Sequence, residues 1–389
     1  MECSHPFSCQ CQPIANVNVL GAQLTRIELS FHRAISVLSI SQVSVWVKSL
    51  NTQHRWVKLD FNACHKNDSN NFTLFIQPDV HCLATKLLHF DVERFTQVRS
   101  ELQLKIEFDQ SFHISVSQCH ILPILCLDTQ GFTHFTYQDL TCSFYQPKAS
   151  FQLHPLIICL HGAGEGGNNQ SNILTDKMAV TFANQLHQDM LDYPYILAPQ
   201  CPSFWVDKFL LNGQYYYGER DYTSDLLALI QDTLIKHQDI DPKRIYIVDG
   251  SMGWYQGLRL FSDPPDLFTA ALIACPAKLP ALEKLHHLKN KKIWLIHSAL
   301  DEVVPIENSL NLLEQIYNEK STQAMFTLYG KVVIEGKVID PHCVFLPLYG
   351  NQLTSGKIPF LNGWDSKEFK KKIAVMYLNR IIKLSYLIN

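Results

Sequence analysis

The chain has 389 residues, with 33 Lys and Arg against 36 Asp and Glu, and 47% of the residues are hydrophobic. This length is sufficient for two domains, and the hydrophobic content supports a large buried core and excludes a disordered chain. The nearly balanced charge gives no electrostatic reason to expect binding to nucleic acid or to a membrane surface. We therefore expect a globular, multidomain protein with neither of these partners.

The targeting signals and the cysteines point to a cytoplasmic protein. No apolar run approaches the roughly 18 residues that span a bilayer. The opening MECSHPFSCQCQ lacks the basic and apolar regions of a signal peptide. Most of the twelve cysteines lie inside apolar runs, which is typical of small buried residues in a reducing compartment.

One group of cysteines, near the N-terminus, has a metal-binding alternative. Cys3, His5, Cys9 and Cys11 lie close together, but their spacing matches no common zinc pattern and has no second half. We interpret them as reduced thiols in a flexible N-terminal segment, residues 1–13. The sequence therefore predicts no metal.

Residues 14–120 have the pattern of an all-β domain. Five stretches alternate in polarity or are rich in β-branched and aromatic residues, namely 25–31, 41–50, 54–61, 71–76 and 101–108. No long helical pattern interrupts them. We expect a small sandwich, of immunoglobulin-like type, that packs against or overhangs the next domain.

Residues 121–389 have a different pattern, in which strands alternate with helices. A hairpin is predicted at 132–147, and apolar strands are predicted at 154–162, 194–200, 244–250, 268–276 and 291–299. Helical apolar spacing occurs at 221–237 and 252–262. This alternation predicts an α/β domain with a doubly wound, mostly parallel sheet, in which reactive groups collect at the carboxyl ends of the strands.

Three reactive side chains follow strand segments of this domain, in the order Ser251, Asp301, His342. That is the chain order of α/β-hydrolase triads. A serine hydroxyl needs a base within hydrogen-bond reach, which His342 would supply, while Asp301 would orient the imidazole. Each residue alone also fits a structural role such as a turn or a helix cap, so the prediction depends on the combination.

A glycine-rich turn after the first parallel strand adds a fourth element. The segment LHGAGEGG, residues 160–167, can direct backbone N–H groups toward a developing oxyanion. We predict the N–H of Ala163 as the donor from this loop, with Gly162 as the alternative. The second donor would be the N–H of Met252, the residue after the nucleophile.

From about residue 130 to 380 the chain resembles the prolyl-oligopeptidase-like esterases of the α/β-hydrolase superfamily, some of which carry an N-terminal immunoglobulin-like domain. The matching segments are 160–167, 197–205, 221–230, 241–253, 297–309 and 341–351. The resemblance implies a triad of Ser251, His342 and Asp301. It also implies ester substrates with a small or medium acyl group and no cofactor or metal.

The departures from the family pattern lie near the predicted nucleophile. Asp249 stands where the family has glycine, Trp254 adds a large ring, and Gly257 stands where the family often has threonine. Because residues three apart on a helix are neighbours, we expect Gly257 to make room for Trp254. Smaller departures are Gly166, Ser298 and Phe345.

The leading hypothesis is a cytoplasmic carboxylic-ester hydrolase that forms an acyl-serine intermediate and acts on a small-molecule ester. A peptidase or amidase on the same triad is the close alternative. The departures at Asp249 and Trp254 motivate a third, a catalytically degenerate hydrolase fold that serves as a binding or scaffolding module. A homo-oligomer is left open.

Overall fold

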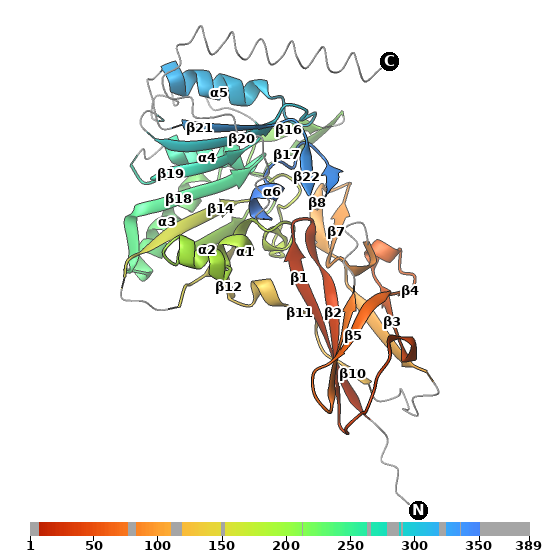
Figure 1. Ribbon diagram of the computed structural model, residues 1–389. Helices are drawn as coiled ribbons and strands as arrows, with labels where there is room; N and C mark the ends of the chain where they lie inside the picture. The colour runs from red at the N-terminus through yellow and green to blue at the C-terminus, as the bar shows by residue number, and fades with distance from the viewer. Residues whose placement is uncertain are drawn as a thin grey trace, which may run out of the picture. The chain divides into compact units, whose positions relative to one another are not determined.

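The protein is described by a computed structural model (Figure 1). The described residues are 8–76, 83–109, 119–148, 152–211, 213–262, 266–277, 288, 291–318, 324–334 and 336–350. Residues 1–7 of the predicted N-terminal segment and 351–389 of the predicted second domain lie outside them. No helix in the described part of the chain is both long enough and apolar enough to span a bilayer.

The chain divides into two compact units. Unit 1 consists of Met1–Phe151, Ala163–Ser203 and Tyr349–Asn351. Unit 2 consists of Gln152–Gly162, Phe204–Leu348 and Gln352–Asn389.

The first part of unit 1 contains two sheets that share one hydrophobic core. One sheet has the order β10-β1-β2-β6-β5, with β11 also paired to β1. Its strands are β1 (Cys9–Asn18), β2 (Gly21–Phe31), β5 (Phe61–Lys66), β6 (Asn71–Ile76), β10 (Cys119–Ile121) and β11 (Leu125–Cys126). The other has the order β4-β3-β9, with β3 (Val43–Lys48), β4 (Val57–Lys58) and β9 (Gln103–Phe108).

Alternation of apolar residues explains this core. Val43, Val45 and Val47 of β3 belong to the same buried cluster as Ile27 and Leu29 of β2. Every second residue of a strand points to the same face, so each sheet presents one apolar face. The described residues of unit 1 also include short 3-10 helices, namely η1 (Ile40–Gln42), η2 (Leu50–Thr52), η3 (Leu83–Thr85), η6 (Leu127–Thr129) and η7 (Ser171–Ile173).

The structure corrects the prediction of a flexible segment through residue 13. Strand β1 begins at Cys9, which pairs with Phe31 of β2. Cys9 and Cys11 are buried in the shared core, 4% and 0% exposed. These alternate positions point inward, so residues 9–13 are held both by strand pairing and by apolar burial. The pairing also passes the predicted boundary at residue 120, because Leu125 of β11 pairs with Ile14.

The rest of unit 1 contains a further antiparallel set of strands. The predicted hairpin at 132–147 is confirmed as β12 (Phe132–Tyr137) and β13 (Leu140–Tyr145), and β13 pairs with β15 (Tyr195–Gln200). Two short helices, α1 (Met178–Ala183) and α2 (Gln185–Met190), precede β15. A separate hairpin consists of β7 (Leu88–Asp91) and β8 (Thr96–Arg99).

Unit 2 contains five parallel strands in the order β14-β18-β19-β20-β21 (Figure 1). They are β14 (His154–Leu160), β18 (Ile240–Gly250), β19 (Ala270–Ala274), β20 (Lys292–Ser298) and β21 (Ala324–Tyr329). All 7 residues of β14 are buried, as expected for a parallel strand covered on both faces. The strands predicted here are confirmed, and the fold is mixed α/β.

The helices of unit 2 follow the predicted pattern. The two helical stretches at 221–237 and 252–262 are confirmed as α3 (Thr223–Lys236) and α4 (Gly253–Ser262). The remaining elements are α5 (Glu307–Asn318), α6 (Leu346–Tyr349) and the hairpins β16 (Lys208–Leu211) with β17 (Gln214–Tyr217) and β22 (Val332–Ile334) with β23 (Lys337–Ile339).

Candidate active site

Ser251 occupies a strained turn between β18 and α4. Its φ is 55°, in the left-handed region that residues other than glycine seldom adopt. The turn is held because the N–H of Ser251 donates to the carbonyl of Ala274 at 2.8 Å. Gly253 starts the helix so close to β14 that an added Cβ would lie 2.4 Å from the carbonyl oxygen of Leu160. Strand, strained turn and tightly packed helix are the local features that a nucleophile elbow requires.

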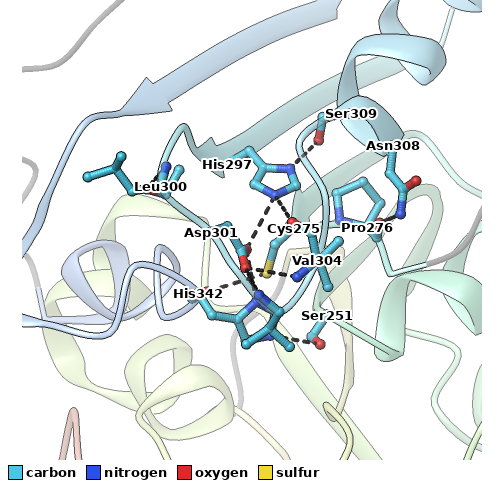
Figure 2. Close-up of polar contacts among 12 residues, drawn as sticks. Ser251, Cys275, Pro276, His297, Leu300, Asp301, Val304, Asn308, Ser309 and His342 are labelled. Atoms are coloured by element: carbon cyan, nitrogen blue, oxygen red, sulfur yellow. Dashed lines mark hydrogen bonds and ion pairs between the residues drawn. The ribbon is translucent and has the colours of Figure 1, made fainter. Parts of the chain in front are cut away.

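The structure brings the three predicted side chains of unit 2 together (Figure 2). His342 Nε2 lies 3.0 Å from Ser251 Oγ, and His342 Nδ1 lies 2.9 Å from Asp301 Oδ2. Ser251 follows β18, Asp301 follows β20 and His342 follows β23. The side chain of Asp301 is 0% exposed and that of His342 is 15% exposed. The three side chains are therefore hydrogen-bonded in a row, with Ser251 and His342 partly exposed to solvent and Asp301 closed off from it.

Asp301 is fixed by several donors besides His342. Its Oδ1 accepts the backbone N–H groups of Val303 and Val304, each at 2.9 Å. Its Oδ2 also lies 3.3 Å from His297 Nε2. Burial alone would raise the pKa of Asp301, but the hydrogen bonds from His297 and His342 outweigh it and hold that pKa below its ordinary value. Asp301 is therefore ionised at neutral pH.

His297 supports this carboxylate from a buried position. Its Nε2 faces two acceptors, Asp301 and the carbonyl of Val304 at 3.1 Å, so this nitrogen carries the proton. Its Nδ1 then accepts from the Ser309 hydroxyl, which lies 2.7 Å away. His297 therefore acts as a buried donor to the Asp301 carboxylate.

The thiol of Cys275 lies beside His342. The sequence analysis did not single out this cysteine as part of the site. Cys275 follows β19, is 0% exposed, and its Sγ lies 3.5 Å from the carbonyl oxygen of His342. Burial opposes the charged imidazolium, but Cys275 and Asp301 outweigh this and raise the pKa of His342 above that of an ordinary imidazole. Its place in the chain could have indicated this contact, because Cys275 directly follows β19, and β19 is the neighbour of β18, after which Ser251 lies.

The prediction that Gly257 makes room for Trp254 is wrong. An added Cβ at Gly257 would lie 2.4 Å from Asp249 Oδ2, and its next neighbours are the Asp249 Cγ and Ile247 Cγ2. Gly257 on α4 therefore makes room for the Asp249 carboxyl on β18. The side chains of both Asp249 and Trp254 are fully buried.

Asp249 differs from Asp301 in having no donors. Neither of its carboxyl oxygens has a hydrogen-bond partner among the described residues, and the same holds for Trp254 Nε1. Burial raises the pKa of Asp249 well above its ordinary value. An unpaired carboxyl in such a position is neutral, because burying an isolated charge costs more than binding a proton.

The glycine-rich loop begins at His161, whose Nδ1 donates to the carbonyl of Gly162 at 2.8 Å. Trp205 Nε1 donates to the carbonyl of His161 at 3.0 Å. Burial lowers the pKa of His161 to about 4, so this imidazole is neutral. The roles of Ala163 and Met252 as oxyanion donors stay predictions.

Within unit 1, the β7–β8 hairpin holds the continuation of this loop. The N–H of Gln97 donates to the carbonyl of Gly164 at 2.9 Å, and Asn169 Nδ2 donates to the carbonyl of Gln97 at 2.8 Å. Gly166 is needed here because an added Cβ would lie 1.7 Å from the carbonyl oxygen of Ser203. A residue with a Cβ would not fit at this position without a shift of the backbone.

One group of described residues has the composition and spacing to hold a metal ion. The ligand atoms of Cys275, Asp301 and His342 all lie within 4.8 Å of one another. Of the cluster considered in the sequence, Cys3 and His5 lie outside the described residues, and Cys9 and Cys11 are core residues of β1.

Comparison with known proteins shows the fold. No family model matches the sequence, and no curated protein matches it. A solved structure described as a thermostable esterase has a TM-score of 0.70 and 24% identity, and the match covers 89% of this chain and 96% of that one. An acylaminoacyl peptidase from Pyrococcus horikoshii has a TM-score of 0.42 and 16% identity, over 61% of this chain and 44% of that one. The first match shows a shared fold, and the second is too weak to argue from.

Proposed function

We propose that this protein is a serine hydrolase that cleaves carboxylic esters with a small or medium acyl group. The observation that carries the proposal is the hydrogen-bonded chain from Ser251 through His342 to Asp301, at 3.0 and 2.9 Å, with Ser251 on a strained turn. Backbone strain of this kind is concentrated at functional sites. The shared fold with a thermostable esterase supports ester chemistry.

The reaction follows from the positions of the protons. His342 Nε2 accepts the Ser251 hydroxyl proton as Oγ attacks the ester carbonyl. Asp301 accepts the Nδ1–H bond and stabilises the imidazolium. His342 then gives its proton to the leaving alkoxide, which departs as the alcohol and leaves an acyl-serine. Water, activated in turn by His342, releases the carboxylic acid and restores Ser251.

The N–H groups of Ala163 and Met252 are our proposed donors to the tetrahedral oxyanion. Loss of one such donor costs about two to three orders of magnitude in rate. The strained turn at Ser251 supports Met252, because the N–H after an elbow nucleophile faces the oxyanion in α/β-hydrolases.

We further propose an α/β-hydrolase domain with a doubly wound sheet, preceded by an immunoglobulin-like sandwich. The order β14-β18-β19-β20-β21, with all neighbours parallel, supports the first part. Two sheets with a shared core support the second, and their strands are antiparallel except where β1 pairs with β10 and β11.

The test is labelling with a fluorophosphonate probe together with hydrolysis of short-chain p-nitrophenyl esters. The wild-type protein should be labelled and should hydrolyse the esters, and Ser251→Ala should lose both. Asn311→Ala, at an exposed position of α5, is a suitable folded control. Equal, trivial rates for the wild type and Ser251→Ala would end the proposal. Faster cleavage of aryl amides than of esters would favour the peptidase or amidase reading.

A specific observation keeps a binding or scaffolding role as a second candidate. Asp249, two residues before the nucleophile, is a buried carboxyl without a described partner. If this group disables the turn, the wild type should resist the probe while Asp249→Gly is labelled at least tenfold faster. Similar labelling of both proteins would exclude the degenerate reading.

A further inference from the structure

Cys275 is held in an unusual backbone conformation beside the proposed catalytic residues. Its φ is 41°, in the left-handed region, and its N–H donates to the carbonyl of Ile296 at 2.9 Å. A residue other than glycine persists there only when its surroundings hold it in place. Because the carboxyl ends of neighbouring parallel strands lie together, this turn places the sulfur near Asp301, which follows β20.

Three different ligand types converge at this point. Figure 2 shows the sulfur of Cys275 close to the carboxylate of Asp301 and the ring of His342. Their ligand atoms lie within 4.8 Å of one another. Zinc bonds of about 2.0 to 2.3 Å in tetrahedral geometry place ligand atoms about 3.3 to 3.8 Å apart. A contraction of roughly an ångström, within reach of small side-chain rotations, would therefore complete three ligand positions.

The surroundings already orient the carboxylate as a ligand. Val303 and Val304 donate to Oδ1 of Asp301, so Oδ2 remains directed toward His342 and His297. Outer hydrogen bonds of this kind orient metal ligands and are part of a working site. His342, with 15% of its side chain exposed, provides the side from which an ion and its fourth ligand, a water molecule, would enter.

The donor set selects the kind of cation. A thiolate, a carboxylate and a neutral imidazole together balance a divalent charge. Sulfur and nitrogen ligands favour zinc-like ions, whereas Mg²⁺ and Ca²⁺ prefer oxygen ligands.

We propose that Cys275, Asp301 and His342 form an inhibitory site for a thiophilic divalent cation such as Zn²⁺. Binding releases the Cys275 thiol proton to solvent and forms bonds from the metal to sulfur, to the carboxylate and to a ring nitrogen. If that nitrogen is Nδ1, the ring proton moves to Nε2, which then faces Ser251 as a donor. If it is Nε2, the lone pair that would accept the Ser251 proton is taken directly. The inhibition rests on the proposed function, but the binding does not.

Cobalt(II) is the probe for binding, because a cobalt–thiolate bond gives a near-ultraviolet absorption band that is independent of catalysis. The full-length protein, freed of metal with a chelator, should develop this band with about one equivalent of Co²⁺. Cys275→Ser and Cys275→Ala should lose the band. Cys343→Ser, which alters the half-buried cysteine next to His342, should keep it. No band in the wild type, or loss only in Cys343→Ser, would overturn the proposal.

Fluorophosphonate labelling in the presence of Zn²⁺ is the probe for inhibition. The wild type should lose labelling with rising Zn²⁺ and regain it after chelation. Cys275→Ser, compared with its own zinc-free rate, should need at least tenfold more Zn²⁺, and its thermal unfolding curve verifies that it is folded. Equal zinc sensitivity in both proteins would overturn the site. If the cobalt band appears but no labelling occurs without metal, the proposed function fails and the cation site stands.

Discussion

Two buried carboxyl groups near the ends of two parallel strands, β18 and β20, have opposite ionisation. Asp301, after β20, has a fully buried side chain but accepts bonds from two backbone amides and two imidazoles, and its pKa is held low. Asp249, at the end of β18, is equally buried but has no described donor, and its pKa is raised. Neither side chain is open to solvent, and the carboxyl that has donors is the charged one.

This difference in charge implies different roles for Asp301 and Asp249. The charged carboxylate of Asp301 can hold His342 in the tautomer that accepts a proton at Nε2. The neutral carboxyl of Asp249 fills the space above Gly257 and has no bond to Ser251 among those of the described residues. We therefore expect substitutions at Asp301 to affect turnover and substitutions at Asp249 to affect stability.

The largest expected effect is the loss of turnover in Asp301→Asn. The amide keeps the size of the side chain but would present its NH₂ or its oxygen without a negative charge to His342, which disturbs the tautomer and the imidazolium. We expect kcat for a p-nitrophenyl ester to fall about 10³- to 10⁴-fold. Asp249→Asn is the matched control and should stay within about tenfold of the wild type. Similar losses in both variants would remove the contrast between the two carboxyls.

A second effect concerns stability against pH. Because the folded pKa of Asp249 is raised, its contribution is fully present below the unfolded pKa of about 3.9 and is lost as pH rises through the folded pKa. The free energy of unfolding of Asp249→Asn, relative to the wild type, should therefore increase between pH 5 and pH 7. The upper limit is about 1.4 kcal/mol per pH unit. Urea titrations at both pH values measure this, and a pH-independent difference would show that Asp249 ionises alike in both states.

A third effect is steric. Gly257→Ala places a methyl group 2.4 Å from Asp249 Oδ2 and should reduce the free energy of unfolding by about 1–3 kcal/mol. The loss should be smaller when Asp249→Gly is also present, which a double-mutant cycle measures. Gly330→Ala is the control, since nothing lies within 4 Å of its added Cβ, and it should change stability by less than about 0.5 kcal/mol. If the two losses of unfolding free energy are additive in the cycle, the contact between Gly257 and Asp249 is contradicted.

The smallest effect is a shift of the pH–rate profile. Cys275 and Asp301 raise the pKa of His342, and only the neutral imidazole acts as base, so kcat/KM should rise toward alkaline pH with a midpoint above about 6.5. Cys275→Ala should move the midpoint to lower pH. The buffers should contain EDTA so that no cation occupies the site. A profile that is flat from pH 6 to 9 would count against His342 as the base.

Most of the elements and the meeting of the three site residues were predictable from local patterns. Continuous apolar runs such as 154–160 indicate buried parallel strands, and helical spacing at 223–236 indicates a covering helix. Strand ends in such a fold lie at one edge, which is why Ser251, Asp301 and His342 were expected to meet. The order of the strands and of the reactive residues is given by the sequence itself, so predicting it does not require the pairing register of the strands.

Register and side-chain direction across the sheet were decided only by the tertiary structure. A flexible segment was predicted through residue 13, but strand β1 begins at Cys9, which pairs with Phe31. Gly257 lies against Asp249 and not against Trp254. The proximity of Cys275 to His342 depends on a left-handed turn that no local pattern indicates. By itself, the sequence determined which elements form and the order of the reactive residues. Which buried groups touch was decided by packing between segments distant along the chain, because that packing sets the donors around each carboxyl.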